Sequence, residues 1–189
     1  MTTRRFMTLA NGKTIDDIAR HLFEDGEINV YAVLDGASIP ELLYRLYELQ
    51  PEHVCLYRGE LEPDIAEVAP YLVRLERDTE FSDWVIEKGW GNHWGIFALS
   101  YEDLRVMRNH FRTFLMVYDP EYKPLYFRYY DPRVLRKYLP TCEGEGLASI
   151  FGPVLSYFLE DEDPKNGLRF CIEDGSLLRE ELAISGAAR

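Results

Sequence analysis

Short apolar runs that alternate with helical stripes constrain the fold of this 189-residue chain more than any other feature. The run NVYAVL at 29–34 has the continuous apolar character of a strand buried on both faces. Alternating strands and helices favour parallel pairing through crossover helices. We therefore expect an α/β fold with a mixed, mainly parallel sheet, helices on both faces and a small C-terminal lobe. The expected strands lie at 29–34, 53–57, 71–75 and 93–99, and the expected helices at 14–23, 38–47, 63–69, 81–88 and 100–114.

The second half of the chain predicts antiparallel pairing instead. Two strands, at 116–118 and 125–130, are separated by a connection short enough for a hairpin. Beyond Pro140, the runs 155–159 and 168–172 are expected to pair across the polar turn EDEDPKNG, and the leucine-rich tail from Ser176 predicts an amphipathic helix. The expected organisation is an α/β domain at 1–140 and a C-terminal lobe with its tail at 141–189, packed as one unit.

The charge of the chain narrows the kinds of partner. With 33 acidic and 21 basic residues the formal net charge is −12, which repels phosphate backbones and anionic lipid surfaces. No run approaches the ~18 apolar residues of a membrane-spanning helix, and the N-terminus lacks the apolar core of a signal peptide. The three cysteines, Cys55, Cys142 and Cys171, form no disulfide framework. We expect a cytoplasmic protein that binds neither nucleic acid nor membrane.

A search for catalytic and metal-binding motifs is negative. The sequence has no GxSxG elbow, no P-loop and no GxGxxG. His53 and Cys55 could share one face of a strand, but no second pair of metal ligands lies at a suitable spacing. The carboxylates have local explanations: Asp35 closes a strand, and the run 160–163 is expected to be a solvated turn. We therefore predict no catalytic residues, no cofactor and no metal site, and a protein that is not an enzyme.

The block LYFRYYDPRVLRKYL, residues 125–139, is the strongest local signal. Its first half alternates with a period of two, which predicts a strand, and Asp131 followed by Pro132 is typical of a helix start. The strand is expected to bring Arg128, Tyr130 and Arg133 to one strand-to-helix junction.

Two interpretations of the candidate binding residues stay open at this point. Arg128 needs a partner if it is half-buried, so it forms either an internal ion pair with an Asp or Glu or a contact with a carboxylate of another protein. Trp90 and Trp94 are either core residues, the favoured interpretation, or part of a binding patch. The candidate partner-binding residues are Arg128, Tyr130, Arg133, Trp90 and Trp94.

An ordered set of motifs resembles a known family. The segments are YAVLDGA, CLYRGEL, APYLVRL, a central WG, NHFRTFL, FRYYDPRVLRKYL and FGPV. Together they resemble the domain of unknown function 4123, adaptor or chaperone proteins of bacterial type VI secretion, over roughly residues 29–158. The resemblance implies a non-enzymatic protein that holds a toxic effector in the cytoplasm and helps load it onto the VgrG spike without travelling with it.

The resemblance leaves the choice of cargo and two other functions open. The segments before about Leu22 and after Leu159 lie outside the shared pattern, so cargo choice is expected there. An immunity protein that neutralises a cognate toxin is the alternative, because small size and acidic charge would also serve it. A hydrolase is the third possibility and requires a concave polar pocket with a perturbed carboxylate or histidine.

Overall fold

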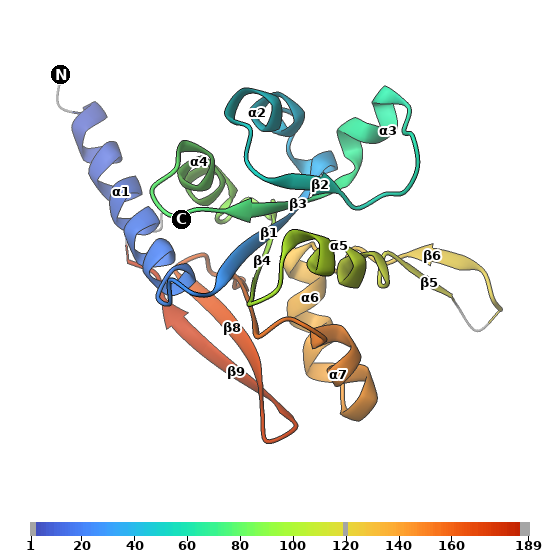
Figure 1. Cartoon of the computed structure of the whole chain (residues 1–189). Helices are drawn as coiled ribbons and strands as arrows, with labels where there is room; N and C mark the ends of the chain where they lie inside the picture. Colours follow the sequence, from blue (N-terminus) through green and yellow to red (C-terminus); the bar gives the residue numbers. More distant parts are fainter. Residues whose placement is uncertain (1–2, 119–120, 186–189) are drawn as a thin grey trace.

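The computed structural model describes residues 3–118 and 121–185, with the side chains described from residue 13 onward. A seven-stranded sheet forms the centre, in the order β2-β3-β1-β4-β7-β8-β9, and a separate hairpin, β5-β6, projects from the body (Figure 1). The strands of the main sheet are β1 (Asn29–Asp35), β2 (His53–Cys55), β3 (Pro70–Leu75), β4 (Gly95–Ser100), β7 (Ser156–Glu160), β8 (Asn166–Glu173) and β9 (Ser176–Ala183). The hairpin strands are β5 (Met116–Tyr118) and β6 (Pro124–Tyr126).

Helices cover both faces of the sheet, as expected. One layer contains α1 (Thr3–Leu22), α2 (Leu42–Leu49) and α4 (Glu80–Gly89), and the other contains α5 (Leu104–Arg112), α6 (Pro132–Tyr138) and α7 (Gly144–Phe151). The short helix α3 (Pro63–Val68) lies between β2 and β3 in the chain, and two 3-10 turns, η1 (Gly36–Ser38) and η2 (Leu139–Thr141), complete the elements.

The central strand β1 shows why the core has two halves. Its residues from Val30 onward are all buried, and alternate side chains point to opposite faces. Tyr31 and Val33 pack into the core beneath α5 and α7, whereas Val30 and Leu34 pack into the core beneath α1, α2 and α4. A strand with helices over both faces needs this continuous apolar run.

The predicted mainly parallel sheet is wrong. Every neighbouring pair in the main sheet is antiparallel, including the pairs of β1 with β3 and with β4. Apolar runs report that a strand is buried but carry no information about its direction, so alternation with helices was an insufficient guide.

Three local predictions were also wrong. The tail from Ser176 to Ala183 is the strand β9, because the open edge of β8 offers it backbone hydrogen bonds along eight residue pairs. The helix expected over 100–114 begins at Leu104 and is capped by Asp103, whose carboxylate accepts from the Val106 N–H. The helix expected over 38–47 begins at Leu42, because Ser38 lies in a 3-10 turn.

The hairpin prediction is confirmed by the antiparallel pairing of β5 with β6, and the connecting residues 119–120 lie outside the described residues. The pairing of β7 with β8 is confirmed as well. Cys55, Cys142 and Cys171 are free thiols, each half-buried. Within the described ranges, no helix has the length and apolar character needed to cross a membrane.

Candidate functional site

Charged and aromatic side chains gather at one end of the main sheet. Strands β1 and β7 end at Asp35 and Glu160, and β4, which lies between them, begins at Gly95. Because the three strands alternate in direction, these termini lie at the same end of the sheet. The segment 127–133, which leads from β6 into α6, supplies the arginines. We call Asp35, His93, Arg128, Asp131, Arg133 and Glu160 the sheet-end cluster.

Asp35 and Arg128 form the first ion pair of the cluster. Its side chain is 2% exposed, and its Oδ2 accepts from Arg128 Nη2 at 2.5 Å and from the Ser38 hydroxyl at 2.7 Å. Its Oδ1 accepts from the Ala37 N–H at 3.3 Å. Burial of a carboxylate is costly unless such partners replace water. The internal ion pair considered for Arg128 is therefore the arrangement in the structure.

The residue after Asp35 explains the DGA motif. Gly36 donates its N–H to the Ala69 carbonyl at 3.1 Å, at the point where α3 returns to the sheet. A Cβ at Gly36 would lie 2.4 Å from the Ala69 oxygen and 2.6 Å from the Glu67 oxygen. Only glycine lets the two backbones approach this closely.

Asp131 and Arg133 form the second ion pair of the cluster. The Asp131 side chain caps α6 through the Arg133 N–H at 2.9 Å and accepts two bonds from the Arg133 guanidinium, at 2.9 and 2.7 Å. Burial would raise the pKa of Asp131, but the bonds from Arg133 outweigh it and hold the pKa below its ordinary value. The helix start predicted from Asp131-Pro132 is confirmed.

Tyr130 does not share a strand face with Arg128. Strand β6 ends at Tyr126, and a turn closed by the Asp131 N–H and the Arg128 carbonyl, 3.1 Å apart, takes the chain into the core. Tyr130 is 4% exposed and lies 5.9 Å from the Arg128 guanidinium, measured to the ring centroid. The strand predicted over 125–130 is thus wrong after Tyr126, because burial of the Tyr129 and Tyr130 rings requires the chain to leave the hairpin.

Glu160 differs from the solvated turn residue predicted from the sequence. It is 3% exposed rather than solvated, and it accepts from the Gly91 N–H at 2.5 Å and pairs with the His93 ring. Burial raises the pKa of Glu160 even though both contacts act to lower it. Its position directly after the largely apolar run 155–159 was the available signal, because side chains alternate along a strand and Glu160 lies on the same face as the buried Phe158.

The two tryptophans pack around the same end of the sheet. Trp90 stacks on Phe158, with ring centroids 5.4 Å apart, and donates from its indole N–H to the Pro164 carbonyl at 2.7 Å. The Trp94 ring lies 4.9 Å from that of Trp84, and the Trp94 carbonyl accepts from the Asp35 N–H at 2.8 Å. Both side chains are half-buried. The geometry favours the core interpretation for both residues.

The sheet-end cluster fastens segments together. Every charged member of it has an opposite charge or a hydrogen-bond partner in contact. Among the described residues, no group of three or more His, Cys, Asp or Glu side chains is arranged to hold a metal ion. The Arg128–Asp35 pair joins the hairpin-to-α6 segment to the end of β1 and so fixes where the hairpin leaves the body, and Glu160 joins the end of β7 to the Gly91–His93 segment.

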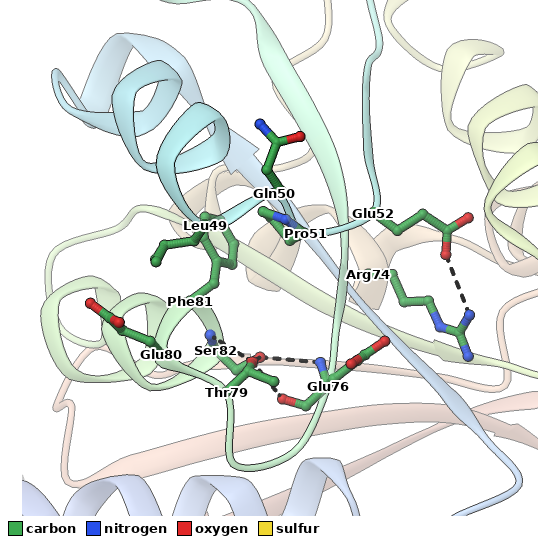
Figure 2. A pocket seen from close by; sticks show the side chains of 10 residues that line it. All are labelled: Leu49, Gln50, Pro51, Glu52, Arg74, Glu76, Thr79, Glu80, Phe81 and Ser82. Atoms are coloured by element: carbon green, nitrogen blue, oxygen red, sulfur yellow. Dashed lines mark hydrogen bonds and ion pairs between the residues drawn. The ribbon is translucent and has the colours of Figure 1, made fainter.

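A small pocket on another edge of the molecule has an equally structural lining (Figure 2). It has a volume of about 210 Å³ and lies between the end of α2 and the turn before α4. Arg74 pairs with Glu52 at 3.3 Å, and the Thr79 side chain caps α4 by accepting from the Ser82 N–H at 3.4 Å. The polar side chains of this pocket therefore stabilise the turn before α4 and the pairing of neighbouring segments at the edge of the sheet.

An open apolar groove lies beside the sheet-end cluster. It has a volume of about 610 Å³ and runs between α3 and the β5-β6 hairpin. Its lining is apolar apart from the guanidinium groups of two arginines and the hydroxyl groups of two tyrosines. The lining residues are Leu56, Tyr57, Arg58, Leu61, Ile65, Val68, Arg112, Leu115, Met116 and Tyr126. Ile65 and Val68 on the α3 wall are 43% and 45% exposed, and Tyr126 on the hairpin wall is 66% exposed.

The hairpin wall is exposed to solvent on both of its faces. All residues of β5 and β6 are exposed, and apolar side chains point from both faces, Met116 and Tyr126 from one and Val117 and Leu125 from the other. A two-stranded hairpin is marginally stable in water when nothing packs on it. Contiguous exposed apolar surface of this kind is typical of protein interaction sites.

Tyr57 joins the groove to the sheet-end cluster. Its ring lies 5.8 Å from the Tyr126 ring in the groove, and its hydroxyl interacts with that of Tyr130. The candidate residues Arg128, Tyr130 and Arg133 do not line the groove, and Tyr130 is connected to it through Tyr57.

The sequence of this region matches a family profile. Residues 30–149 match the family described as Domain of unknown function (DUF4123). The chain belongs to this family. Searches of curated proteins and of solved structures find no match. The DUF4123 region includes both walls of the groove and all of the sheet-end cluster except Glu160, whereas the whole of α1 and the strands β7 to β9 lie outside it.

Proposed function

We propose that this protein is a non-enzymatic adaptor that binds a type VI secretion effector in the cytoplasm and helps load it onto the VgrG spike. Membership of DUF4123 supports the proposal, because the motifs that resemble the adaptor family, apart from FGPV at 151–154, fall within residues 30–149. The observation that carries it is the open apolar groove bordered by an exposed hairpin. Such a surface is stabilised when another protein covers it.

The polar parts of the molecule support the same proposal. The buried carboxylates Asp35, Asp131 and Glu160 are engaged with arginine, histidine or backbone N–H groups. Within the described part of the chain, these groups brace the fold beside the groove. Their placement fits a role in presenting a binding surface.

Co-expression with the effector and the spike protein encoded by neighbouring genes tests the proposal. We expect affinity capture of this protein to retain the effector, with a dissociation constant in the micromolar range or tighter. Deletion of its gene should abolish effector secretion and leave self-protection unaffected. Protection of cells that express the toxin alone would instead establish an immunity protein, and no binding to either partner at micromolar concentrations would refute the adaptor function.

A further inference from the structure

An arginine engages the backbone carbonyls of the edge strand at the floor of the groove. The Arg112 guanidinium donates to the carbonyls of Cys55, Leu56 and Tyr57, at 2.9, 3.0 and 2.9 Å. These are the carbonyls at and after the end of β2, the edge strand on this side of the sheet. A partner strand that approached this stretch of β2 would have to share these carbonyls with the Arg112 guanidinium or displace it. An occupant that inserts side chains between the walls, as a helix does in a hydrophobic groove, leaves the three bonds intact.

The spacing of the α3 wall suits a helix. Leu61, Ile65 and Val68 follow each other at intervals of four and three residues, and all line the groove. The facing wall presents Leu115, Met116 and Tyr126. An apolar stripe that repeats every three or four residues packs between such walls.

The segment that carries the α3 wall is acidic, and we call its four carboxylates the acidic rim. Glu60, Glu62, Asp64 and Glu67 are all exposed, and none of them forms a salt bridge within the described part of the chain. Residues 58–68 contain these four carboxylates and one arginine, Arg58, so the segment has a formal charge of −3. Arg112 lies below the rim and is held by its three carbonyls. Basic side chains beside the apolar stripe of an occupant would complement this rim.

We propose that the groove binds an amphipathic helix of the effector, with an apolar stripe flanked by lysine or arginine on the side that faces α3. This inference rests on the proposed adaptor function and adds the chemistry of the recognised segment. The hairpin supplies the second wall and lies between the helix and the body. The sheet-end cluster fixes its position.

Binding measurements on purified protein and the effector encoded by the neighbouring gene test the inference. We expect Ile65→Asp and Val68→Asp each to weaken binding about 30-fold, because a carboxylate enters the apolar wall. Ile172→Asp is the matched control: Ile172 on β8 is 39% exposed, close to the 43% of Ile65, and lies far from the groove in the sheet order. It should bind as the wild type does. Melting temperatures confirm that all three variants are folded.

The charge of the helix is tested separately. Asp64→Lys combined with Glu67→Lys should weaken binding about 10-fold at low salt and less at high salt. Glu24→Lys with Glu27→Lys reverses two exposed carboxylates at the same spacing elsewhere and should have no effect.

The outcomes distinguish the two proposals. If the wild type binds the effector and Ile65→Asp and Val68→Asp bind equally well, the groove is not the binding site. The adaptor function would still stand. Loss of binding with Ile65→Asp but not with the reversed rim charges would overturn the basic flank of the helix. No binding of the wild type would refute the adaptor function and this inference with it.

Discussion

Replacing Gly95 by alanine should lower the free energy of unfolding by about 3 kcal/mol, or the melting temperature by roughly 6 to 12 °C for a chain of this size. Gly95 begins β4 and pairs with Leu34 of β1, at the centre of the sheet. A Cβ at this position would lie 2.2 Å from the Val33 carbonyl oxygen and 3.0 Å from its carbon. Both atoms belong to the backbone of the central strand, so no side-chain movement can relieve the contact. Thermal unfolding of the purified variant measures the effect.

Gly146→Ala is the matched control for this prediction. Gly146 lies in α7, and a Cβ there would meet nothing within 4 Å. Alanine has the higher helix propensity, so the melting temperature should stay the same or rise slightly. A loss below about 0.5 kcal/mol for Gly95→Ala would contradict the close approach of β1 and β4, because a true backbone clash cannot cost so little.

Replacing Arg128 by alanine should lower the free energy of unfolding by about 2 kcal/mol, because Asp35 stays buried and loses its charged partner. The Asp35 side chain is 2% exposed, whereas that of Arg128 is 47% exposed, so water screens the pair in part and the loss falls below that of a fully buried ion pair. The bonds from Ser38 and Ala37 to Asp35 remain. Urea unfolding of the variant gives the value.

Arg77→Ala tests whether the loss is specific to the buried partner. Arg77 pairs with Asp78 at 4.0 Å, and both side chains are more than half exposed, so its removal should leave the stability almost unchanged. If Arg128→Ala also leaves the stability unchanged while binding to the effector is lost, Arg128 contacts the partner and the Asp35 pair does not stabilise the fold.

Local signals predicted the elements whose structure depends on neighbouring residues. Asp131-Pro132 starts α6 because the cap and the proline act within one turn. The β5-β6 hairpin and the buried strand β1 follow from a short connection and a continuous apolar run. These features are legible because the interactions that determine them are close in sequence.

The predictions that failed depend on contacts between distant segments. Strand direction is set by the packing of the whole sheet, and β9 forms where the leucine spacing allowed a helix because β8 offers a free edge. Glu160 is buried by the Gly91–His93 segment, 67 to 69 residues earlier in the chain. The groove escaped the sequence analysis for the same reason, since its two walls lie about 50 residues apart.

The candidate residues therefore stabilise the fold and do not line the groove. Arg128 and Arg133 pair with Asp35 and Asp131, and Trp90 and Trp94 pack at the sheet end. The residues that line the groove, such as Ile65 and Met116, have no unusual chemistry and become noticeable only when the fold leaves them exposed.

Hydrogen exchange of the protein, free and bound to the effector, tests the central claim most directly. In the free protein the amides of β5, β6 and α3 should exchange rapidly, because these short elements are exposed. In the complex we expect strong protection of 63–68, 116–118 and 124–126 and unchanged exchange in β8 and β9. Protection confined to β8 and β9, or to any region that leaves both walls of the groove unaffected, would show that the partner binds elsewhere.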